Sequence, residues 1–332
     1  MTRSYPATRM RRLRQKGWIR DLIRENHLKC SDLVWPTFVV EGKQIKQPCE
    51  NFPGVYRLSI DSLLEKLKEV RDLGIKAVAI FPVIDPSLKD SKGSESTKPY
   101  QLMVRAIQAI KTTFGDDFGV IADVALDPYT SHGHDGVLDE RGYVNNDATV
   151  AALVEQANVL AHCGCDILAP SDMQDGRVGA IRGSLEAAGH HNVIILSYAV
   201  KYASKLYSPF RGAVGSASQL GSKDKSHYQQ DYANSDESMV EVELDLQEGA
   251  DIIMIKPAMM YQDVIYRVKE HYQVPVWAYQ VSGEYSMLKS FEKSCGYQES
   301  ELMVESLVAL KRSGSDVMIT YAACEVASLL LK

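Results

Sequence analysis

Short apolar runs recur along the chain, and segments with helical periodicity separate them. Their apolarity is continuous rather than alternating, which predicts strands buried on both faces, as in a parallel sheet covered by helices. The expected strands lie near 34–40, 76–83, 118–125, 166–170, 192–198, 251–256, 275–281 and 316–321.

The segment 60–73 shows how the intervening helices are marked. Its apolar residues, at positions 60, 63, 64, 67, 70 and 73, fall on one face of a helix. Gly74 follows, where the end of a helix favours a left-handed residue. Glycines stand in the same place before later runs, as in GCDILAP and GADIIMIKP. The repeating unit is therefore a helix, a glycine stop and a short buried strand.

Eight buried strands alternating with helices favour a (β/α)8 TIM barrel. The alternative is an open doubly wound sheet, but no G-x-G-x-x-G motif follows an early strand. We expect one catalytic barrel domain over residues 33–332, preceded by an extended N-terminal arm over residues 1–32.

Composition narrows the function classes. The chain has 332 residues and a net charge of −6, with no basic stripe along its body, so nucleic acid is not the expected partner. Its six cysteines lack the spacing of a disulfide framework, which indicates a reducing compartment. The pair Cys163 and Cys165 in HCGCD could bind metal, but small cysteines also suit a crowded junction between a helix and a strand, and we favour packing.

Residues 1–32 form an unusual N-terminal segment. Seven arginines lie within the first 24 residues, yet Asp21 and Glu25 follow early. A transit peptide can be Arg-rich in this way. A basic arm that lies on an acidic neighbouring subunit fits the pattern at least as well.

Two neighbouring strands deliver lysines to the same end of the barrel. The run GADIIMIKP stops on Lys256, and the preceding strand leads to Lys201 and Lys205. A single lysine would more often hold an anion, but two facing ammonium groups between apolar walls should lower at least one pKa from its usual value of about 10.4. A neutral amine can attack a ketone and form a Schiff base. The pattern predicts covalent chemistry on one or two carbonyl substrates, without choosing between Lys201 and Lys205.

The segment 202–235 is long for a connection between strand and helix. Stretches of this length are usually functional lids or disorder. Its cations, among them Arg211, Lys223 and Lys225, could close over a carboxylate. A surface excursion with solvated charges is the alternative.

The segment DVALDPYTSHGHDG gathers acids and histidines after the third strand. It could hold a cation, and its oxygen-rich character suits magnesium better than zinc. Asp127 and Asp135 could instead be polar wall or proton-transfer groups.

Two other functions remain open from the residues alone. One is a class I aldolase-type barrel with a single Schiff-base lysine, although TYAACE lacks the glycine expected of a phosphate cradle. The other is a non-catalytic barrel that binds a small acid and leaves both lysines with ordinary pKa values.

Six segments, in order along the chain, match one enzyme family: DVALDPYTSHGHDG, APSDMQDGRV, SYAVKYASKLYSPFR, GADIIMIKPAMMYQD, YQVSGEY and ITYAA. On these motifs the chain resembles the porphobilinogen synthases, also called 5-aminolevulinate dehydratases, over nearly its whole length. The resemblance implies a lyase that condenses two molecules of 5-aminolevulinate into porphobilinogen, with loss of two waters, early in tetrapyrrole (haem and chlorophyll) biosynthesis.

The resemblance also implies roles for individual residues. Lys256 matches the lysine that forms a Schiff base with the first substrate, and Lys201 matches the second Schiff-base lysine. Lys225 falls where many members have an arginine, which keeps the charge but loses the bidentate fork. The other matching positions are Ser282 and Tyr321 for the first substrate's carboxylate, Arg211 and Gln229 for the second, and Asp123, Ser171 and Tyr207 as further pocket residues.

The metal pattern departs from that of the zinc-dependent members. They carry three cysteines where this chain has Ala125, Asp127 and Asp135, so the resemblance implies no catalytic zinc. It implies an aspartate-rich, magnesium-responsive enzyme, with Glu241 as a ligand of an allosteric magnesium ion. It further implies a homo-octamer in which the arm wraps around a neighbour, and a cytoplasmic, bacterial-type location, with a plastid as the alternative.

Overall fold

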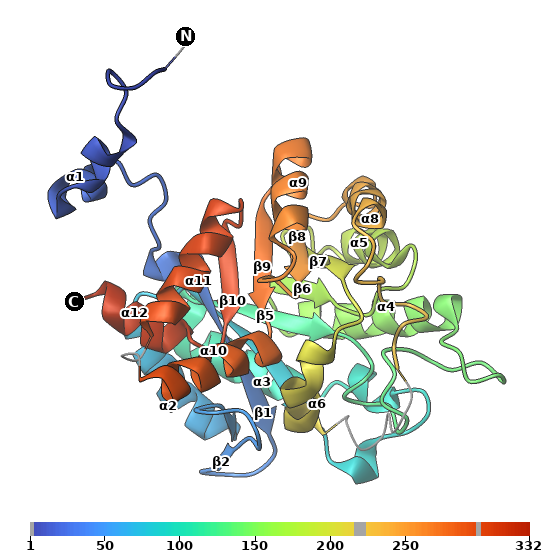
Figure 1. The fold of residues 1–332 in the computed structure, drawn as a ribbon. Coiled ribbons are helices and arrows are strands. Elements are labelled where there is room, and N and C mark those ends of the chain that lie inside the picture. The colour runs from blue at the N-terminus through green and yellow to red at the C-terminus, as the bar shows by residue number, and fades with distance from the viewer. Residues whose placement is uncertain (1–2, 216–223, 297–299) are drawn as a thin grey trace.

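The computed structural model describes residues 3–215, 224–296 and 300–332 of the chain (Figure 1). Its central feature is a closed parallel sheet of eight strands, in the order β1, β4, β5, β6, β7, β8, β9 and β10, and β10 pairs with β1. The bounds of these strands are Leu33–Val40, Ala77–Val83, Gly119–Val124, Ile167–Pro170, Ile194–Lys201, Ile252–Lys256, Val276–Gln280 and Val317–Thr320. The pairing of β10 with β1 closes the (β/α)8 barrel and excludes the open sheet.

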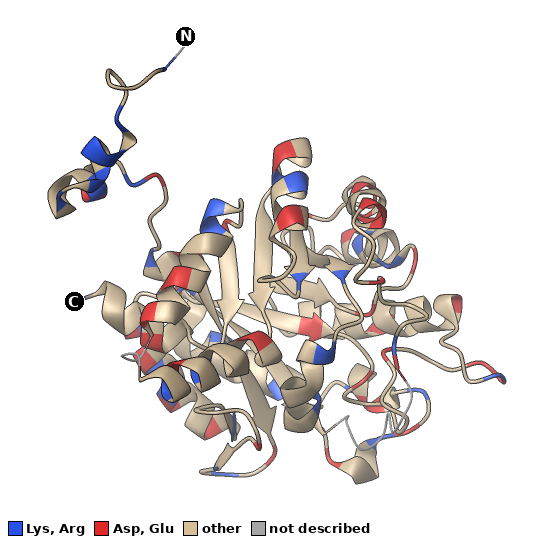
Figure 2. Cartoon of the chain, in the orientation of Figure 1, with Lys and Arg blue, Asp and Glu red and all other residues tan. Residues whose placement is uncertain are grey.

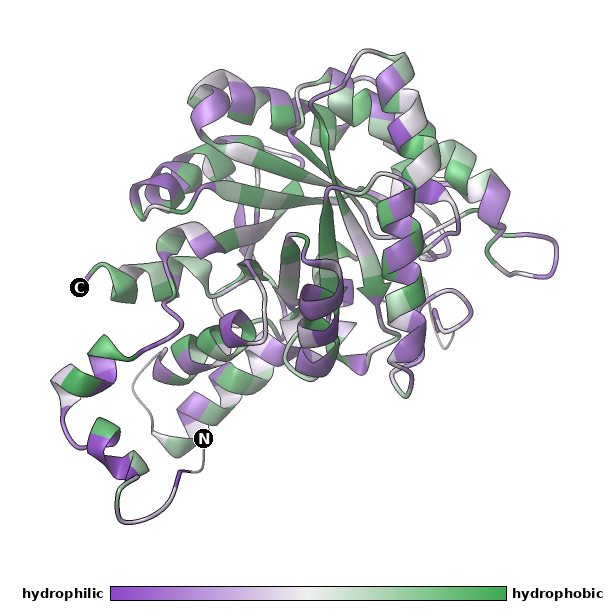
Figure 3. Ribbon diagram, turned by 90° about the horizontal axis from the view of Figure 1, so that it is seen from above, coloured by the Kyte–Doolittle hydropathy of each residue, from purple (hydrophilic) through white to green (hydrophobic). Residues whose placement is uncertain are grey.

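All eight expected strands are present, each within about two residues of its expected start. Figure 3 shows them as hydrophobic ribbons that converge in the middle of the molecule. The sequence analysis missed a short antiparallel hairpin, β2 (Lys46–Pro48) and β3 (Tyr56–Leu58), which adds to the sheet beside β1. These strands are three residues long, and all of β2 is exposed, so they lack the apolar run that marks the others.

Helices cover the outside of the barrel. The α-helices are α1 (Gly17–Leu22), α2 (Ile60–Asp72), α3 (Leu102–Phe114), α4 (Asn146–His162), α5 (Arg177–Ala187), α6 (Ser208–Val214), α8 (Asp236–Gln247), α9 (Gln262–Tyr272), α10 (Ser282–Cys295), α11 (Glu301–Arg312) and α12 (Ala323–Leu330). The short 3-10 helices are η1 (Met10–Arg14), η2 (Cys30–Asp32), η3 (Pro86–Leu88), η4 (Ser94–Thr97), η5 (Gly115–Asp117) and η6 (Lys205–Tyr207). Within the described residues, no helix combines the length and apolarity needed to cross a bilayer.

The expected unit of helix, glycine and strand is confirmed at α2. Leu63, Leu67 and Val70 are fully buried, and they form the face that packs on the barrel. Gly74 follows with a φ of +82°, a left-handed conformation that a residue with a Cβ adopts only at a cost. The chain then turns directly into β4.

The cysteines of the motif HCGCD lie at the junction of α4 and β6. Cys163 and Cys165 lie between the two elements and are buried, and burial raises the pKa of the Cys163 thiol to about 12. All six cysteines are free thiols. Packing between a helix and a strand therefore accounts for this pair.

The N-terminal segment stands apart from the barrel (Figure 1). Neither η1 nor α1 contains a buried residue, and the side chains of Trp18 and Leu22 are 61% and 76% exposed. Figure 2 shows that lysines and arginines cluster on this segment. This segment is therefore basic, and its large apolar side chains stay mostly exposed among the described residues.

Candidate active site

Lys201 and Lys256 are the last residues of β7 and β8, and they are register partners on these adjacent strands. The pairing shifts by one residue between Ser197 and Val200, where β7 has an irregularity. Both lysines are buried, with exposed fractions of 5% and 6%. The barrel therefore brings two amines to the same end, and the structure sets Lys205 apart as an exposed residue on η6.

Aromatic rings surround the Lys256 ammonium. Its Nζ lies 4.6 Å from the ring centroid of Tyr279, 5.0 Å from that of Tyr198, 5.3 Å from that of Phe210 and 5.4 Å from that of Tyr207. Burial among these rings, with a smaller contribution from the charge of Lys201, lowers the pKa of Lys256 to about 7. A substantial fraction of Lys256 is therefore neutral near pH 7.

Lys201 contacts the end of the neighbouring strand β6. Its Nζ donates a hydrogen bond to the backbone carbonyl of Ser171. The hydroxyl of Tyr207 donates to the backbone carbonyl of Lys256 at 3.2 Å. The first bond links Lys201 to the residue that follows β6, and the second links η6 to the end of β8.

A small cavity of about 30 Å³ lies between the lysines and the segment that follows β7. Ten of the residues singled out from the sequence line it, together with Phe210: Asp123, Asp127, Asp135, Ser171, Lys201, Tyr207, Arg211, Lys225, Gln229 and Lys256. A space of this size holds water but not two organic acids.

Three residues of this cavity form a buried ionic group. The Lys225 ammonium lies 3.2 Å from a carboxylate oxygen of Asp127 and 3.0 Å from one of Asp135. Burial opposes the charge on Lys225, but the two carboxylates outweigh it and raise its pKa. Burial likewise opposes the charge on Asp135, yet Lys201 and Lys225 hold its pKa well below the usual range.

The other two aspartates carry a proton more readily. Burial raises the pKa of Asp123 to about 6, and the neighbouring Asp127 adds to the shift. Burial also raises the pKa of Asp127, and the charge of Asp135 adds to the shift, while the Lys225 ammonium opposes it. The structure thus distinguishes three acids that the sequence could not rank.

Ser282 and Tyr321 do not line the small cavity. The Ser282 hydroxyl donates to the Leu206 carbonyl at 3.2 Å and accepts from the Phe210 amide at 3.1 Å, so it engages the segment after β7. The Tyr321 hydroxyl lies 3.1 Å from that of Tyr279, one of the rings around Lys256. Each predicted residue therefore contacts a neighbour of Lys256: Ser282 binds the backbone of Phe210, and Tyr321 binds the hydroxyl of Tyr279.

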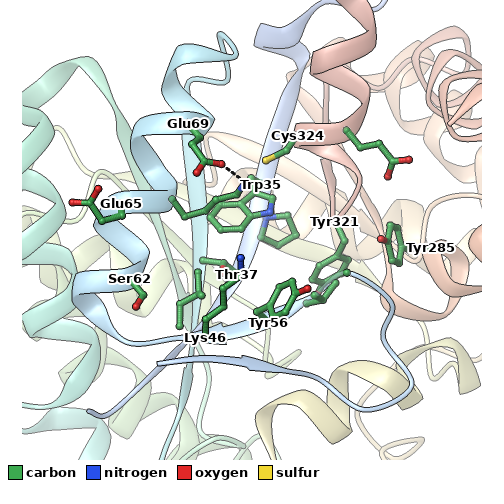
Figure 4. A pocket seen from close by; sticks show the side chains of 16 residues that line it. Trp35, Thr37, Lys46, Tyr56, Ser62, Glu65, Glu69, Tyr285, Tyr321 and Cys324 are labelled. Carbon is green, nitrogen blue, oxygen red and sulfur yellow. Dashed lines mark hydrogen bonds and ion pairs between the residues drawn. The ribbon is translucent and has the colours of Figure 1, made fainter. Parts of the chain in front are cut away.

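Tyr321 also lines a larger cavity, of about 460 Å³, on its other side. Figure 4 shows this space between β1, α2 and the β2–β3 hairpin, with Tyr285 and Tyr321 at one end. Acidic side chains, Glu65, Glu69 and Glu325, are part of its lining. We call it the α2 cavity.

Glu241 lies away from the lysines, on α8. Burial raises its pKa to about 7, an effect that Asp245, Asp175 and Glu237 reinforce and Arg177 opposes. Glu241, Glu237 and Asp175 line a cavity of about 330 Å³ that also contains Tyr228 and Gln229. The predicted allosteric residue thus lies among other carboxylates, and a bound cation would stabilise its ionised form.

The histidines of SHGHD contact each other and the chain. The backbone amide of His134 donates to Nδ1 of His132 at 3.2 Å, and Nδ1 of His134 lies 3.4 Å from the Tyr228 hydroxyl. Burial lowers the pKa of His134 to about 4. Across the described parts of the chain, no three or more His, Cys, Asp or Glu side chains are grouped so that they could hold a metal ion.

Sequence reasoning missed several residues of this site. Tyr198, Tyr279 and Phe210 come from three elements, and only the folded barrel brings their rings around one lysine. A pattern could have found Tyr198 and Tyr279, because each interrupts a buried aliphatic strand with a polar atom. Part of the predicted lid, residues 216–223 with Lys223, lies outside the described residues.

Comparisons with known proteins agree with one another. Residues 7–329 match the family described as delta-aminolevulinic acid dehydratase. The chain is 49% identical over 324 residues to a protein of that name from Bradyrhizobium diazoefficiens, covering 98% of this chain and 91% of the relative. It is 45% identical to one from Chlamydia pneumoniae, covering 98% of this chain and 96% of that one.

A solved structure is similar over the whole barrel. It is the delta-aminolevulinic acid dehydratase (porphobilinogen synthase) of Toxoplasma gondii, in complex with the reaction product porphobilinogen. The two share 44% sequence identity with a TM-score of 0.94, over 97% of this chain and 91% of the other.

Proposed function

The chain belongs to the delta-aminolevulinic acid dehydratase family, and we propose that it performs the family's reaction by holding two substrates covalently, on Lys256 and Lys201. The reaction condenses two molecules of 5-aminolevulinate to porphobilinogen with loss of two waters, a step of tetrapyrrole biosynthesis. The observation that carries the proposal is the pairing of two buried lysines, one with a pKa of about 7. A class I aldolase would use a single Schiff-base lysine, and a non-catalytic barrel would leave both lysines with ordinary pKa values. Two paired lysines, one with a lowered pKa, fit neither alternative.

Each lysine captures a ketone by the same steps. The neutral amine adds to the carbonyl carbon to give a carbinolamine, whose hydroxyl takes up a proton and leaves as water, which gives a protonated imine. The imine withdraws electrons from the adjacent carbon, so that carbon loses a proton and can form a bond to the second molecule. Two substrates held side by side also avoid much of the entropic barrier to a bimolecular reaction, worth up to about 7–11 kcal/mol in favourable cases.

Two aspartates are suited to move protons in these steps. Asp123, with a pKa of about 6, can exchange a proton near neutral pH. Asp127 has a raised pKa and lines the same cavity. Asp135 stays ionised beside Lys225, so we assign it an electrostatic role.

The segment after β7 closes the site. A cavity of about 30 Å³ cannot admit 5-aminolevulinate, so the segment must move aside for substrate and return. Arg211 and Gln229 come from this segment and line the cavity, and the guanidinium of Arg211 and the side-chain NH2 of Gln229 can both donate to a carboxylate. We assign these two residues to the carboxylate of the second substrate.

The remaining binding roles need rearrangement of present contacts. Lys225 can join Arg211 only by leaving Asp127 or Asp135, since its ammonium lies between them. Ser282 and Tyr321 can hold the first substrate's carboxylate once their hydroxyls exchange Leu206 and Tyr279 for substrate oxygens. Tyr207 and Ser171 frame the two lysines.

The described residues hold no complete set of three ligand side chains, so the surroundings of Glu241 suit a magnesium ion that keeps most of its waters and binds through one or two carboxylates. Magnesium prefers carboxylate and water oxygens, and the surrounding carboxylates that raise the pKa of Glu241 would be offset by a dication. The Lys225 ammonium already balances charge at Asp127 and Asp135, and neither residue is a thiol, so this pair does not suit zinc. We therefore propose a regulatory magnesium ion at Glu241 and no catalytic zinc.

The N-terminal arm, residues 1–32, is proposed to contact another copy of the chain in a homo-octamer. Its exposed Trp18 and Leu22 need a partner surface, and its arginines need an acidic one. The α2 cavity offers apolar walls and three glutamates, although Lys46 and Lys66 also line it and Lys66 pairs with Glu69 (Figure 4). We also infer a cytoplasmic location, which the six free thiols support.

Trapping with borohydride tests the covalent mechanism. Reduction in the presence of 5-aminolevulinate should leave a stable adduct on Lys256, and a second one on Lys201 at higher substrate concentration, both located by peptide mass spectrometry. Lys205→Met, which removes an exposed lysine of the same segment, should change neither adduct nor porphobilinogen formation. An active enzyme without an adduct at Lys256 would rule out the mechanism.

A further inference from the structure

The short helix α6 carries two residues of the active site and cannot stand alone. Phe210 packs against Lys256 at 5.3 Å, and Arg211 lines the cavity. A helix of seven residues is far shorter than the length at which isolated helices persist in water. Contacts from the rest of the barrel must therefore fix its position.

The first turn of α6 is held from α10. The Ser282 hydroxyl accepts the Phe210 amide at 3.1 Å. Gly283 follows Ser282 in α10 and packs against η6, the 3-10 helix just before α6. A Cβ on Gly283 would lie 2.5 Å from the carbonyl oxygen of Leu206 in η6. This end of the helix is thus fixed by a hydrogen bond and by close backbone packing.

The last turn of α6 is held by Arg57 of the β2–β3 hairpin. Its Nε donates to the carbonyl of Ala213 at 2.8 Å, and its Nη2 donates to the carbonyl of Gly212 at 2.9 Å. The final carbonyls of a helix lack partners within the helix and carry partial negative charge, so a cation that donates to both satisfies them. Arg57 does not line the cavity of the two lysines.

The pairing of β3 with β1 fixes where Arg57 stands. Arg57 is the register partner of Phe38, and the Phe38 ring lies 5.5 Å from that of Phe210. Two neighbouring strands therefore contact α6: β3 through the hydrogen bonds of Arg57, and β1 through the ring of Phe38. A displacement of Arg57 would move the turn that carries Phe210 and Arg211.

We propose that Arg57 is a positioning residue of the active site, which fixes α6 so that Arg211 meets the second substrate. This inference rests on the proposed function, in which Arg211 holds that substrate's carboxylate. A guanidinium suits the task because its two parallel N–H groups reach neighbouring carbonyls at once, whereas an ammonium is a single point charge.

The test compares Arg57→Met with Arg57→Lys. In Arg57→Met, the 5-aminolevulinate concentration that gives half the maximal rate should rise about tenfold, as expected for loss of charged hydrogen bonds. The maximal rate should fall by less than about threefold. Arg57→Lys should recover part of the loss, and amide exchange in residues 208–215 should be faster in Arg57→Met than in the parent. The matched control is Arg71→Met, which removes an exposed arginine of α2.

The outcomes separate this proposal from the one it rests on. Unchanged kinetics in Arg57→Met, beside weakened substrate binding in Arg211→Met, would overturn the role of Arg57 and leave the proposed function intact. Unchanged kinetics in Arg211→Met would contradict the assignment of Arg211 itself. Loss of the borohydride adduct on Lys256 in Arg57→Met and Arg57→Lys alike would mean a general collapse, which also overturns a positioning role.

Discussion

Lys201 faces Lys256 because β7 carries one residue more than β8 between two points of pairing. Ser197 pairs with Ile253 and Val200 with Ile255, so β7 advances three residues while β8 advances two. Without the extra residue, the partner of Lys256 would be Val200, and Lys201 would point to the opposite face of the sheet. A local irregularity next to an active site, of the kind that re-aims a side chain, thus creates the lysine pair.

This pairing predicts how each lysine affects the other. The charge of Lys201 lowers the pKa of Lys256, after the larger effect of burial. In the parent, the initial rate of adduct formation on Lys256 should rise with pH around a midpoint near 7. In Lys201→Met the ammonium is gone, so the midpoint should move to higher pH. Trapping with borohydride between pH 5.5 and 9, followed by mass spectrometry, measures both.

A midpoint that stays in place, or moves to lower pH, would show that Lys201 does not act on Lys256 through its charge. Lys205→Met is the control, since it removes a lysine that is exposed and lies outside the cavity. Its profile should match that of the parent.

Burial of Lys256 also predicts a pH-dependent cost in stability. Its pKa is about 7 in the folded protein, while in the unfolded chain it is near 10.4. Between these values the unfolded chain binds more protons, so the unfavourable contribution of Lys256 to the free energy of unfolding lessens as pH rises. Lys256→Met should unfold at a higher temperature than the parent at pH 7, and the difference should shrink toward pH 10. Calorimetry at several pH values would contradict this if the variant were less stable throughout.

The lysine pair also marks the limit of what the sequence predicts. Continuous apolar runs set the eight strands, and the barrel then places the ends of β7 and β8 together, so Lys256 and a lysine near 201 could be expected to meet. The extra residue in β7 could not be expected, since no glycine or proline marks it. The choice of Lys201 over Lys205 therefore needed the family resemblance.

Contacts between distant segments were the least predictable part of the site. Lys225 stays proposed for a substrate carboxylate, but no sequence pattern indicates that its ammonium lies between Asp127 and Asp135, 98 and 90 residues earlier in the chain. Arg57 comes from a hairpin whose strands are too short and too polar to be predicted from the sequence. Such pairs are fixed by tertiary packing, which has no periodic signal in the sequence.

The ion pairs of Lys225 predict a strong effect of its removal. In Lys225→Met, two buried carboxylates would lose the ammonium that lies between them, and breaking a buried ion pair costs about 3–5 kcal/mol. We expect a loss of that order in the free energy of unfolding, measured by denaturant titration at pH 7. A further Asp135→Asn change should restore part of it, because only one carboxylate then remains. Equal stability of parent and Lys225→Met would mean that Lys225 is not held between the acids in solution.

Because Trp18 and Leu22 of the N-terminal arm are exposed, we expect the oligomeric state to depend on these two side chains. Among the described residues, Trp18 and Leu22 remain 61% and 76% exposed. If they pack on another copy, the double variant Trp18→Ser, Leu22→Ser should sediment as a smaller species than the parent in analytical ultracentrifugation. Tyr100→Ser, which changes a residue that is 83% exposed on the barrel, serves as the control. A parent and a double variant of the same size would contradict the role of the arm.

The raised pKa of Glu241 predicts that the response of the enzyme to magnesium depends on pH. Glu241 has a pKa of about 7 because burial, reinforced by Asp245, Asp175 and Glu237, disfavours its charge. Magnesium needs the ionised carboxylate, so protons compete with the metal, and its apparent affinity should rise from pH 6 to pH 8. After treatment with EDTA, added magnesium should raise the unfolding temperature by more at pH 8 than at pH 6, and it should restore more activity than zinc.

Glu241→Gln separates this site from any other cation site. The amide keeps the size of the side chain but removes the charge, so the magnesium-dependent rise in unfolding temperature should be lost. Glu243→Gln, on the exposed face of the same helix, should retain it. Adduct formation on Lys256 should persist in both variants, because Glu241 does not line the lysine cavity. A magnesium response that survives in Glu241→Gln would place the ion elsewhere, whereas restoration by zinc alone would contradict an oxygen-ligand site altogether.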